Sequence, residues 1–216
     1  MKIVNGASLQ PRSGARPRQI VLLLHGFGSS GRDMIALAPT WQHAMPDALF
    51  LAPHAPQRCA VGQGYQWWAL SQINPHALAA GAASAAPAID SFIDRKLAQY
   101  GLSDTDLALV GFSQGTMMAL HVGLRRKAGV AAIVGYSGML TGAAELSREI
   151  VPRPPVLLIH GAQDEVVPVA ALYAAESELK HLGIAVTAHV CPGTGHSVDP
   201  VGLRLGREFV AGALAG

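Results

Sequence analysis

The chain has 216 residues, of which half are hydrophobic and 14% are charged, and its formal net charge is +2. This length and composition suit one folded domain over residues 1–216 and exclude a disordered or fibrous chain. The longest basic run is only Arg125–Lys127, so there is no case for nucleic-acid binding. The longest strongly apolar run, residues 20–24, is far too short to cross a bilayer as an integral segment.

The cysteine content and the N-terminal segment bear on the cellular compartment. Cys59 and Cys191 lie far apart and form neither a disulfide framework nor a zinc-binding pattern. Residues 1–19 contain no apolar stretch long enough for a signal peptide. We therefore expect a cytoplasmic protein with reduced thiols, without a metal or another cofactor.

Short apolar runs alternate with longer helix-like segments along the chain. Residues 1–11 can form an added antiparallel edge strand or hairpin. Buried strands are predicted at 19–25, 48–53, 107–112, 130–137, 155–161 and 184–191. Helices are predicted at about 31–45, 75–99, 114–127, 168–182 and 201–214. The alternation predicts an α/β fold with a mostly parallel sheet and helices on both faces.

The predicted strand 107–112 leads into a Gly-x-Ser-x-Gly motif, Gly111 to Gly115, with Ser113 at its centre. A predicted helix follows at once, which is the context of a strained turn that presents a nucleophilic serine. The same pattern is also compatible with a small residue in a tight turn, and glycine is frequent in this chain. Partners for Ser113 must therefore be sought elsewhere.

A serine nucleophile needs a histidine base and a carboxylate, which follow it in the order Ser, acid, His in this kind of fold. Asp164 lies just past the predicted strand 155–161, where α/β sheets gather their sites, and Glu165 is the competing acid. Of the nine histidines, His196 stands in a glycine-rich loop after the last strand and follows Asp164. His25 and His160 each precede a glycine at a strand end, which fits a role in bracing a loop.

The loop after the first central strand allows two interpretations. Gly26, Gly28 and Gly31 match the dinucleotide fingerprint G-x-G-x-x-G. That fingerprint expects an acid at the end of the second strand, and the sequence there, FLAPHAP, has none. The dinucleotide interpretation is therefore disfavoured, and Asp33 is expected to brace this loop or the helix that follows.

Taken together, these segments resemble the carboxylesterase/phospholipase family of small α/β-hydrolases, which includes the acyl-protein thioesterases. The matching segments are LLLHGFGSSGRDM (22–34), GFSQGTMMAL (111–120), YSGML (136–140), HGAQDEVVP (160–168) and GTGHSVDP (193–200), in the family order. The resemblance implies Ser113 as nucleophile, Asp164 as orienting acid and His196 as base. It also implies the backbone N–H groups of Phe27 and Gln114 as oxyanion donors.

The segment GYQWWAL (64–70) looks like the family's Trp-Phe element, but Trp68 stands where the family often has Phe. This departure leaves the substrate range open. No separate lid domain is visible, so we expect a shallow, open site. The residues expected to line it are Tyr65, Trp67, Trp68, Leu70, Ile73, Met139, Leu140 and Val166. For one of the two tryptophans, packing in the core is favoured over contact with the substrate.

The sequence therefore predicts a serine carboxylesterase for short- and medium-chain esters, whose partner is a small-molecule ester or thioester. Two alternatives stay open. One is a thioesterase or lysophospholipase that acts on acylated proteins, coenzyme A esters or lysolipids with the same triad. The other is a catalytically silent binding protein on a hydrolase scaffold, against which the intact Ser, Asp and His argue. A homodimer is also open, although the sequence identifies no surface for it.

Overall fold

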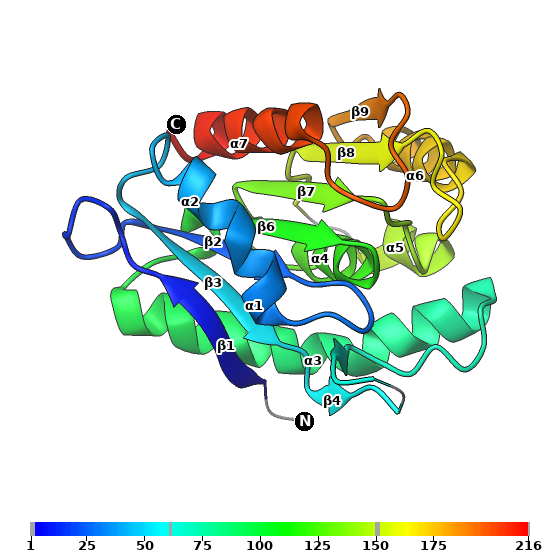
Figure 1. Cartoon of the computed structure of the whole chain (residues 1–216), viewed down its shortest axis with the longest axis horizontal. Coiled ribbons are helices and arrows are strands. Elements are labelled where there is room, and N and C mark those ends of the chain that lie inside the picture. The colour runs from blue at the N-terminus through cyan, green and yellow to red at the C-terminus, as the bar shows by residue number, and fades with distance from the viewer. Residues whose placement is uncertain (1–2, 61, 150–151, 216) are drawn as a thin grey trace.

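A seven-stranded sheet forms the centre of the computed structural model, which describes residues 3–60, 62–149 and 152–215 (Figure 1). The strand order is β1-β3-β2-β6-β7-β8-β9. Only β1 runs antiparallel to its neighbour, β3, while the other pairs in this sheet are parallel. The strands are β1 (Val4–Leu9), β2 (Gln19–Leu24), β3 (Ala48–His54), β6 (Leu107–Phe112), β7 (Ala132–Tyr136), β8 (Val156–Gly161) and β9 (Val186–Cys191).

Both faces of the sheet are buried, which explains the continuous apolar runs of its central strands. In β2, Ile20, Leu22 and Leu24 enter one hydrophobic cluster. Val21 and Leu23, which alternate with them, enter a second cluster on the opposite face. The sheet therefore separates two hydrophobic cores, and its carboxyl edge is left to carry polar loops.

Helices cover the two faces as two layers. The first core contains residues from α3 (Pro75–Tyr100), α4 (Gln114–Gly123), α5 (Ala143–Glu149) and α6 (Ala170–His181). The second contains residues from α1 (Gly31–Met34), α2 (Ala38–Trp41) and α7 (Pro200–Ala215). The described residues also form two 3₁₀ turns, η1 (Ile35–Leu37) and η2 (Asp104–Asp106). Among the helices of the described ranges, none is both long enough and apolar enough to cross a membrane.

The architecture agrees with the predicted α/β class, and residues 4–9 form the antiparallel edge strand that was one option for the N-terminal segment. The predicted helix at 31–45 is wrong as a single element. Three short pieces, α1, η1 and α2, replace it, and α2 restarts with Pro39 in its first turn. Proline has no backbone N–H to donate to the preceding turn, so a continuous helix is interrupted there.

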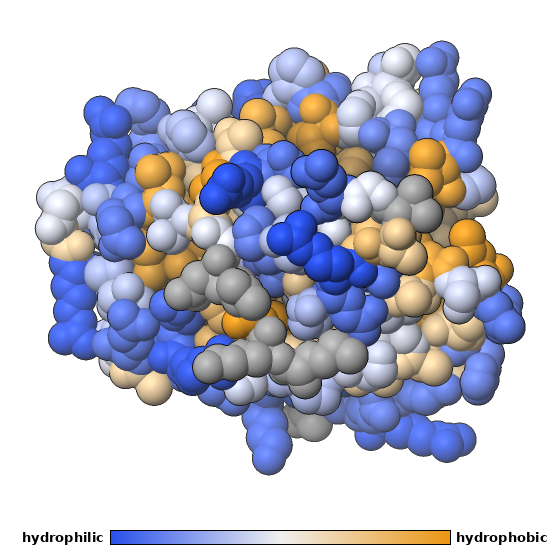
Figure 2. All heavy atoms as spheres, turned by 60° about the horizontal axis from the view of Figure 1, so that its bottom comes forward, coloured by the Kyte–Doolittle hydropathy of each residue, from blue (hydrophilic) through white to orange (hydrophobic). Residues whose placement is uncertain are grey.

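A second, two-stranded sheet was not predicted. It pairs β4 (Gln57–Arg58) with β5 (Tyr65–Gln66) in antiparallel fashion. This small sheet lies between β3 and α3 in the chain, near the carboxyl edge of the main sheet. Figure 2 shows the side of the molecule that comes forward from the bottom of Figure 1, where hydrophobic residues are dispersed among hydrophilic ones.

Candidate active site

Ser113 occupies a strained turn between β6 and α4. Its backbone angles, φ 54° and ψ −117°, lie in a region that residues with a side chain rarely adopt. The Ser113 N–H donates to the carbonyl oxygen of Tyr136 on β7 at 2.9 Å, which holds the turn onto the sheet. The side chain is half-buried. The strand–turn–helix context expected for a Gly-x-Ser-x-Gly elbow is therefore present.

The two glycines of the motif are required by close packing. A Cβ atom at Gly111 would lie 2.3 Å from the carbonyl oxygen of Gly115, and one at Gly115 would lie 1.9 Å from that of Leu24. Real Cβ atoms do not approach backbone atoms so closely, so larger residues would force strand, turn and helix apart. The glycines let the serine turn sit directly against β2.

Asp164 follows β8 and its side chain is fully buried. Its Oδ1 accepts the N–H groups of Val166 at 3.0 Å and Val167 at 2.8 Å. Burial opposes ionisation of this carboxyl, but the hydrogen bonds from His196 and from these two N–H groups outweigh it and lower the pKa of Asp164. The carboxylate is therefore kept ionised and fixed in orientation.

The other oxygen of Asp164 meets His196, in the loop after β9. Nδ1 of His196 lies 2.8 Å from Oδ2 of Asp164. Because an ionised carboxylate only accepts hydrogen bonds, Nδ1 carries the proton and Nε2 keeps the lone pair of a base. The imidazole packs against Phe112, the residue before Ser113, with the ring centroids 4.8 Å apart.

The loops that carry this pair are tied to each other by their backbones. The Gln163 N–H donates to the carbonyl oxygen of Thr194 at 2.9 Å, and a Cβ at Gly161 would lie 2.2 Å from that of Gly195. Residues 161–164 and 191–195 are thus held in contact. The structure therefore brings Asp164 and His196 together beside the Ser113 turn, while Glu165, the competing acid, is exposed.

The loop after β2 carries Phe27, whose side chain is 46% exposed. Gly28 has a left-handed φ of 78°, and a Cβ at Gly31 would lie 1.9 Å from the carbonyl oxygen of Ala52. Two of the three glycines read above as a possible dinucleotide fingerprint thus serve the turn and its packing. Asp33 accepts hydrogen bonds from the hydroxyls of Ser29 at 2.9 Å and Ser30 at 2.8 Å, which lower its pKa. It braces this loop as expected.

His25 braces the start of the same loop. Its Nδ1 lies 2.7 Å from the carbonyl oxygen of Gly26, and its Nε2 accepts the N–H of Ala55 at 3.0 Å. Burial lowers the pKa of His25 from 6.5 to about 4. The ring is therefore neutral at pH 7 and fixed as the Nδ1–H tautomer by its two partners.

With this geometry established, comparisons with known proteins decide the family. A sequence model described as phospholipase/carboxylesterase matches residues 10–213. The chain belongs to the phospholipase/carboxylesterase family. As a member of this family it is a hydrolase.

Three relatives illustrate the likeness. The crystal structure of esterase PE8 superposes with a TM-score of 0.94 at 42% identity, covering 99% of this chain and 100% of that one. Esterase YpfH of Escherichia coli K12 is 26% identical over 183 residues, covering 84% of this chain and 77% of the relative. Acyl-protein thioesterase 1 of Schizosaccharomyces pombe is 30% identical over 190 residues, covering 83% and 84%.

The side chains expected to wall the site of this hydrolase fall into three groups by their exposure. Trp67 and Trp68 are buried in the first core, with 1% and 5% of their surface exposed, so the expectation that one of them lines an open site is corrected. The ring of Trp68 packs so closely on α3 that a Cβ at Gly81 would lie 2.3 Å from it. By contrast, Val166 and Ile73 are exposed, while the remaining four are half-buried: Tyr65, Leu70, Met139 and Leu140.

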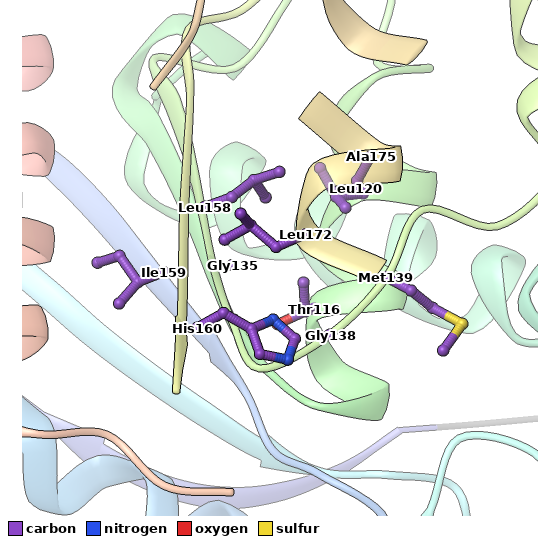
Figure 3. Close-up of a pocket in the computed structure, with 10 residues that line it drawn as sticks. All are labelled: Thr116, Leu120, Gly135, Gly138, Met139, Leu158, Ile159, His160, Leu172 and Ala175. Atoms are coloured by element: carbon purple, nitrogen blue, oxygen red, sulfur yellow. The ribbon is translucent and has the colours of Figure 1, made fainter. Parts of the chain in front are cut away.

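A narrow interior space lies behind the elbow (Figure 3). Its lining includes Thr116, Gly138, Met139 and His160, and it leaves no room for a water molecule. In Figure 3 the imidazole of His160 lies beside Thr116 and Gly138, whereas the thioether of Met139 points away from them. The sulfur atom of Met139 therefore lies outside the interior space behind the elbow.

His160 supports the acid rather than the serine. Its Nε2 lies 2.7 Å from the carbonyl oxygen of Val167 and 3.3 Å from Oδ2 of Asp164. Because Nε2 must donate to the carbonyl, its proton also lies near the carboxylate. The expected loop-bracing role of His160 is thus seen, with an added contact to Asp164 that the sequence did not reveal.

Within residues 3–60, 62–149 and 152–215, no group of three or more His, Cys, Asp or Glu side chains is placed to hold a metal ion.

The sequence did not reveal how the Gln114 side chain is used. This amide is buried and bonds to the backbone of Trp67 and Trp68, 47 and 46 residues away in the chain. A glutamine directly after a nucleophile candidate, at the first turn of a fully buried helix, is the local signal that a partner must exist.

Proposed function

We propose that this hydrolase is a serine carboxylesterase that cleaves short- and medium-chain carboxylic esters through Ser113, His196 and Asp164. The observation that carries the proposal is the 2.8 Å contact between His196 Nδ1 and Asp164, made beside the strained Ser113 turn. This contact sets the tautomer that leaves Nε2 able to accept a proton from a serine hydroxyl.

The proposed reaction proceeds through an acyl-enzyme. Ser113 Oγ attacks the ester carbonyl while His196 Nε2 takes its proton, and the carbonyl oxygen becomes an oxyanion. The backbone N–H groups of Phe27 and Gln114 stabilise that oxyanion, and Asp164 stabilises the charged imidazole. His196 then protonates the departing alcohol. A water molecule repeats the sequence on the acyl-enzyme and releases the carboxylic acid.

The preference for shorter acyl chains is supported by the shape of the site. The space behind the elbow does not admit even a water molecule, so an acyl chain would lie along an open surface beside Leu70, Met139 and Val166. An open surface buries only part of a long chain, so added methylene groups would gain less than the roughly 0.8 kcal/mol each that full burial gives. We therefore expect butyrate and hexanoate esters to be preferred over palmitate esters.

The decisive experiment is intact-mass analysis after brief exposure to a fluorophosphonate, on the wild type and on Ser113→Ala. A single adduct on the wild type that is absent from the variant supports the nucleophile, and p-nitrophenyl esters of increasing length then define acyl preference. Absence of an adduct on folded wild type, or esterase activity retained by Ser113→Ala, contradicts the proposal. The first of these results would favour the silent-scaffold alternative.

A thioesterase activity is the second candidate, because several relatives, including that of Schizosaccharomyces pombe, are named acyl-protein thioesterase 1. The same triad serves both reactions. Paired oxyester and thioester substrates with one acyl chain distinguish them. A kcat/KM that is consistently higher for the thioesters would favour the second candidate.

A further inference from the structure

A short segment, Gly64–Trp68, contacts both sides of the candidate oxyanion hole, and we call it the strut. It comprises Gly64, β5 and the two tryptophans, and it makes backbone and side-chain hydrogen bonds to two separate parts of the chain. One is the loop 25–29, which carries Phe27. The other is Gln114, the residue after Ser113.

The strut holds the Phe27 loop on both sides of Phe27. The Trp67 indole N–H donates to the carbonyl oxygen of His25 at 2.9 Å, two residues before Phe27. After Phe27, the Gly28 N–H donates to the carbonyl oxygen of Tyr65 at 2.9 Å, and the Tyr65 N–H donates to that of Ser29 at 2.8 Å. The strut therefore makes three hydrogen bonds to residues that flank Phe27, one before it and two after it.

The strut is fastened to the elbow by the side chain of Gln114. Its Oε1 accepts a hydrogen bond from the backbone N–H of Trp67 at 3.0 Å, and its Nε2 donates to the carbonyl oxygen of Trp68 at 2.9 Å. Gln114 is 1% exposed, so these two bonds are made away from solvent. A buried amide held at both ends has little freedom, and losing either bond would leave a buried polar group unpaired.

We propose that the strut sets the separation of the two oxyanion donors, and that the Gln114 side chain is the positioning group that couples it to the elbow. Gln114 thus serves twice, with its backbone N–H at the oxyanion and its amide on the strut. The inference rests on the proposed function, because it presupposes that the N–H groups of Phe27 and Gln114 meet an oxyanion. Preorganised donors stabilise a transition state only when they already stand where its charge develops.

The test compares Gln114→Met, which keeps the length of the side chain but removes both bonds, with the wild type. Loss of a whole oxyanion donor typically costs about 10²–10³ in rate, so misplacement is expected to lower kcat by roughly 10- to 100-fold. KM should change less than about threefold, because the ground-state carbonyl depends little on the hole. Gln19→Met is the matched control. It removes a 2.6 Å bond from Nε2 to the carbonyl oxygen of Leu214, at the opposite edge of the sheet, and should retain full activity.

A pair of inhibitors separates positioning from general damage. A trifluoromethyl ketone forms a hemiketal: the serine oxygen bonds to the carbonyl carbon, its proton passes to His196, and the ketone oxygen becomes an oxyanion. The matching methyl ketone binds without accumulating this charge. In Gln114→Met, the inhibition constant of the trifluoromethyl ketone should rise by the same factor as kcat/KM falls, while that of the methyl ketone stays unchanged.

Three outcomes would overturn the inference: an unchanged kcat in folded Gln114→Met, equal weakening of both ketones, or a lower kcat with trifluoromethyl ketone binding unchanged. If Gln114→Met does not fold, Gly64→Ala takes its place, since its Cβ would lie 1.8 Å from the carbonyl oxygen of Gly28 and must displace the loop from the other end of the strut. The same correlated loss is expected there. Failure of the proposed function itself is distinguishable, because wild type would then neither hydrolyse esters nor form a fluorophosphonate adduct at Ser113.

Discussion

At the scale of single residues, Asp164 divides its two oxygens between two tasks. Oδ1 accepts two backbone N–H groups, while Oδ2 accepts the Nδ1–H of His196 and lies 3.3 Å from Nε2 of His160. Because the two oxygens have different partners, the orientation of an amide group at position 164 can be predicted. In Asp164→Asn, the amide oxygen is expected to remain with the N–H groups of Val166 and Val167, which places the amide NH₂ opposite His196.

The variant Asp164→Asn should therefore lose most activity. An NH₂ group donates to Nδ1, which forces the imidazole proton onto Nε2, and His196 can no longer act as a base toward serine. We expect kcat to fall by about 10³–10⁴, as for loss of a triad acid by an isosteric amide. Glu165→Gln is the control and should retain activity because Glu165 is exposed. Steady-state kinetics with a p-nitrophenyl ester decide, and the reverse pattern would transfer the role to Glu165.

The lowered pKa of His25 predicts that the protein becomes less stable as the pH falls below neutrality. Its pKa is about 4 in the folded chain and 6.5 when unperturbed, so between these values the unfolded chain binds more protons. The contribution of neutral His25 to the free energy of unfolding should therefore be complete above pH 6.5. It should decrease by about 3 kcal/mol as the pH drops toward 4. Buried His121, whose pKa is also lowered to about 4 by burial, acts in the same direction.

Urea unfolding at pH 7, 6 and 5 measures this loss. His25→Gln should start from a lower stability at pH 7, because it loses ring packing and its bonding geometry. Its stability should then decline less steeply with acid, because glutamine takes up no proton. Parallel slopes for wild type and variant would show that His25 does not contribute to the pH dependence.

At the scale of elements, α4 can approach β2 closely only because Gly115 has no side chain. A methyl group there would lie 1.9 Å from the carbonyl oxygen of Leu24 and 2.8 Å from that of His25, both backbone atoms that cannot rotate away. Gly115→Ala should therefore cost about 3 kcal/mol or more, with a Tm lower by roughly 6–12 °C.

Gly212→Ala is the matched control on α7, where a Cβ would meet no atom within 4 Å. Alanine is the better helix former, so this variant should gain about 0.5–1 kcal/mol. Thermal melts followed by circular dichroism compare the two. Equal Tm values for both variants would contradict the close approach of α4 to β2.

The same elements show what the sequence could and could not predict. The parallel strands and α3 were predictable because apolar periodicity records burial. The proximity of Asp164 and His196 was predictable because parallel strands end at one edge, while the choice of Asp164 over Glu165 needed the family resemblance. By contrast, β4 and β5 have two residues each, too few for any periodicity. The bonds from Gln114 to Trp67 and Trp68 join segments about 46 residues apart, which no local pattern encodes.

At the scale of the whole molecule, the two cysteines report on global opening. Cys59 and Cys191 are both free and buried, and burial together with the hydrogen bond to Asp199 raises the pKa of Cys191 to about 12. Ellman's reagent should therefore react slowly with native protein and quickly with both thiols in guanidinium chloride. A reducing agent should leave Tm unchanged. Rapid reaction of a thiol under native conditions would show that its segment opens locally.

The backbone of Ser113 has a consequence for the stability of the chain. A residue with a side chain at φ 54°, ψ −117° typically costs about 1–3 kcal/mol, and glycine at the same place would release most of it. The proposed nucleophile thus stands where loss of function raises thermodynamic stability. The strained backbone thus sets thermodynamic stability against the proposed chemistry at this one position.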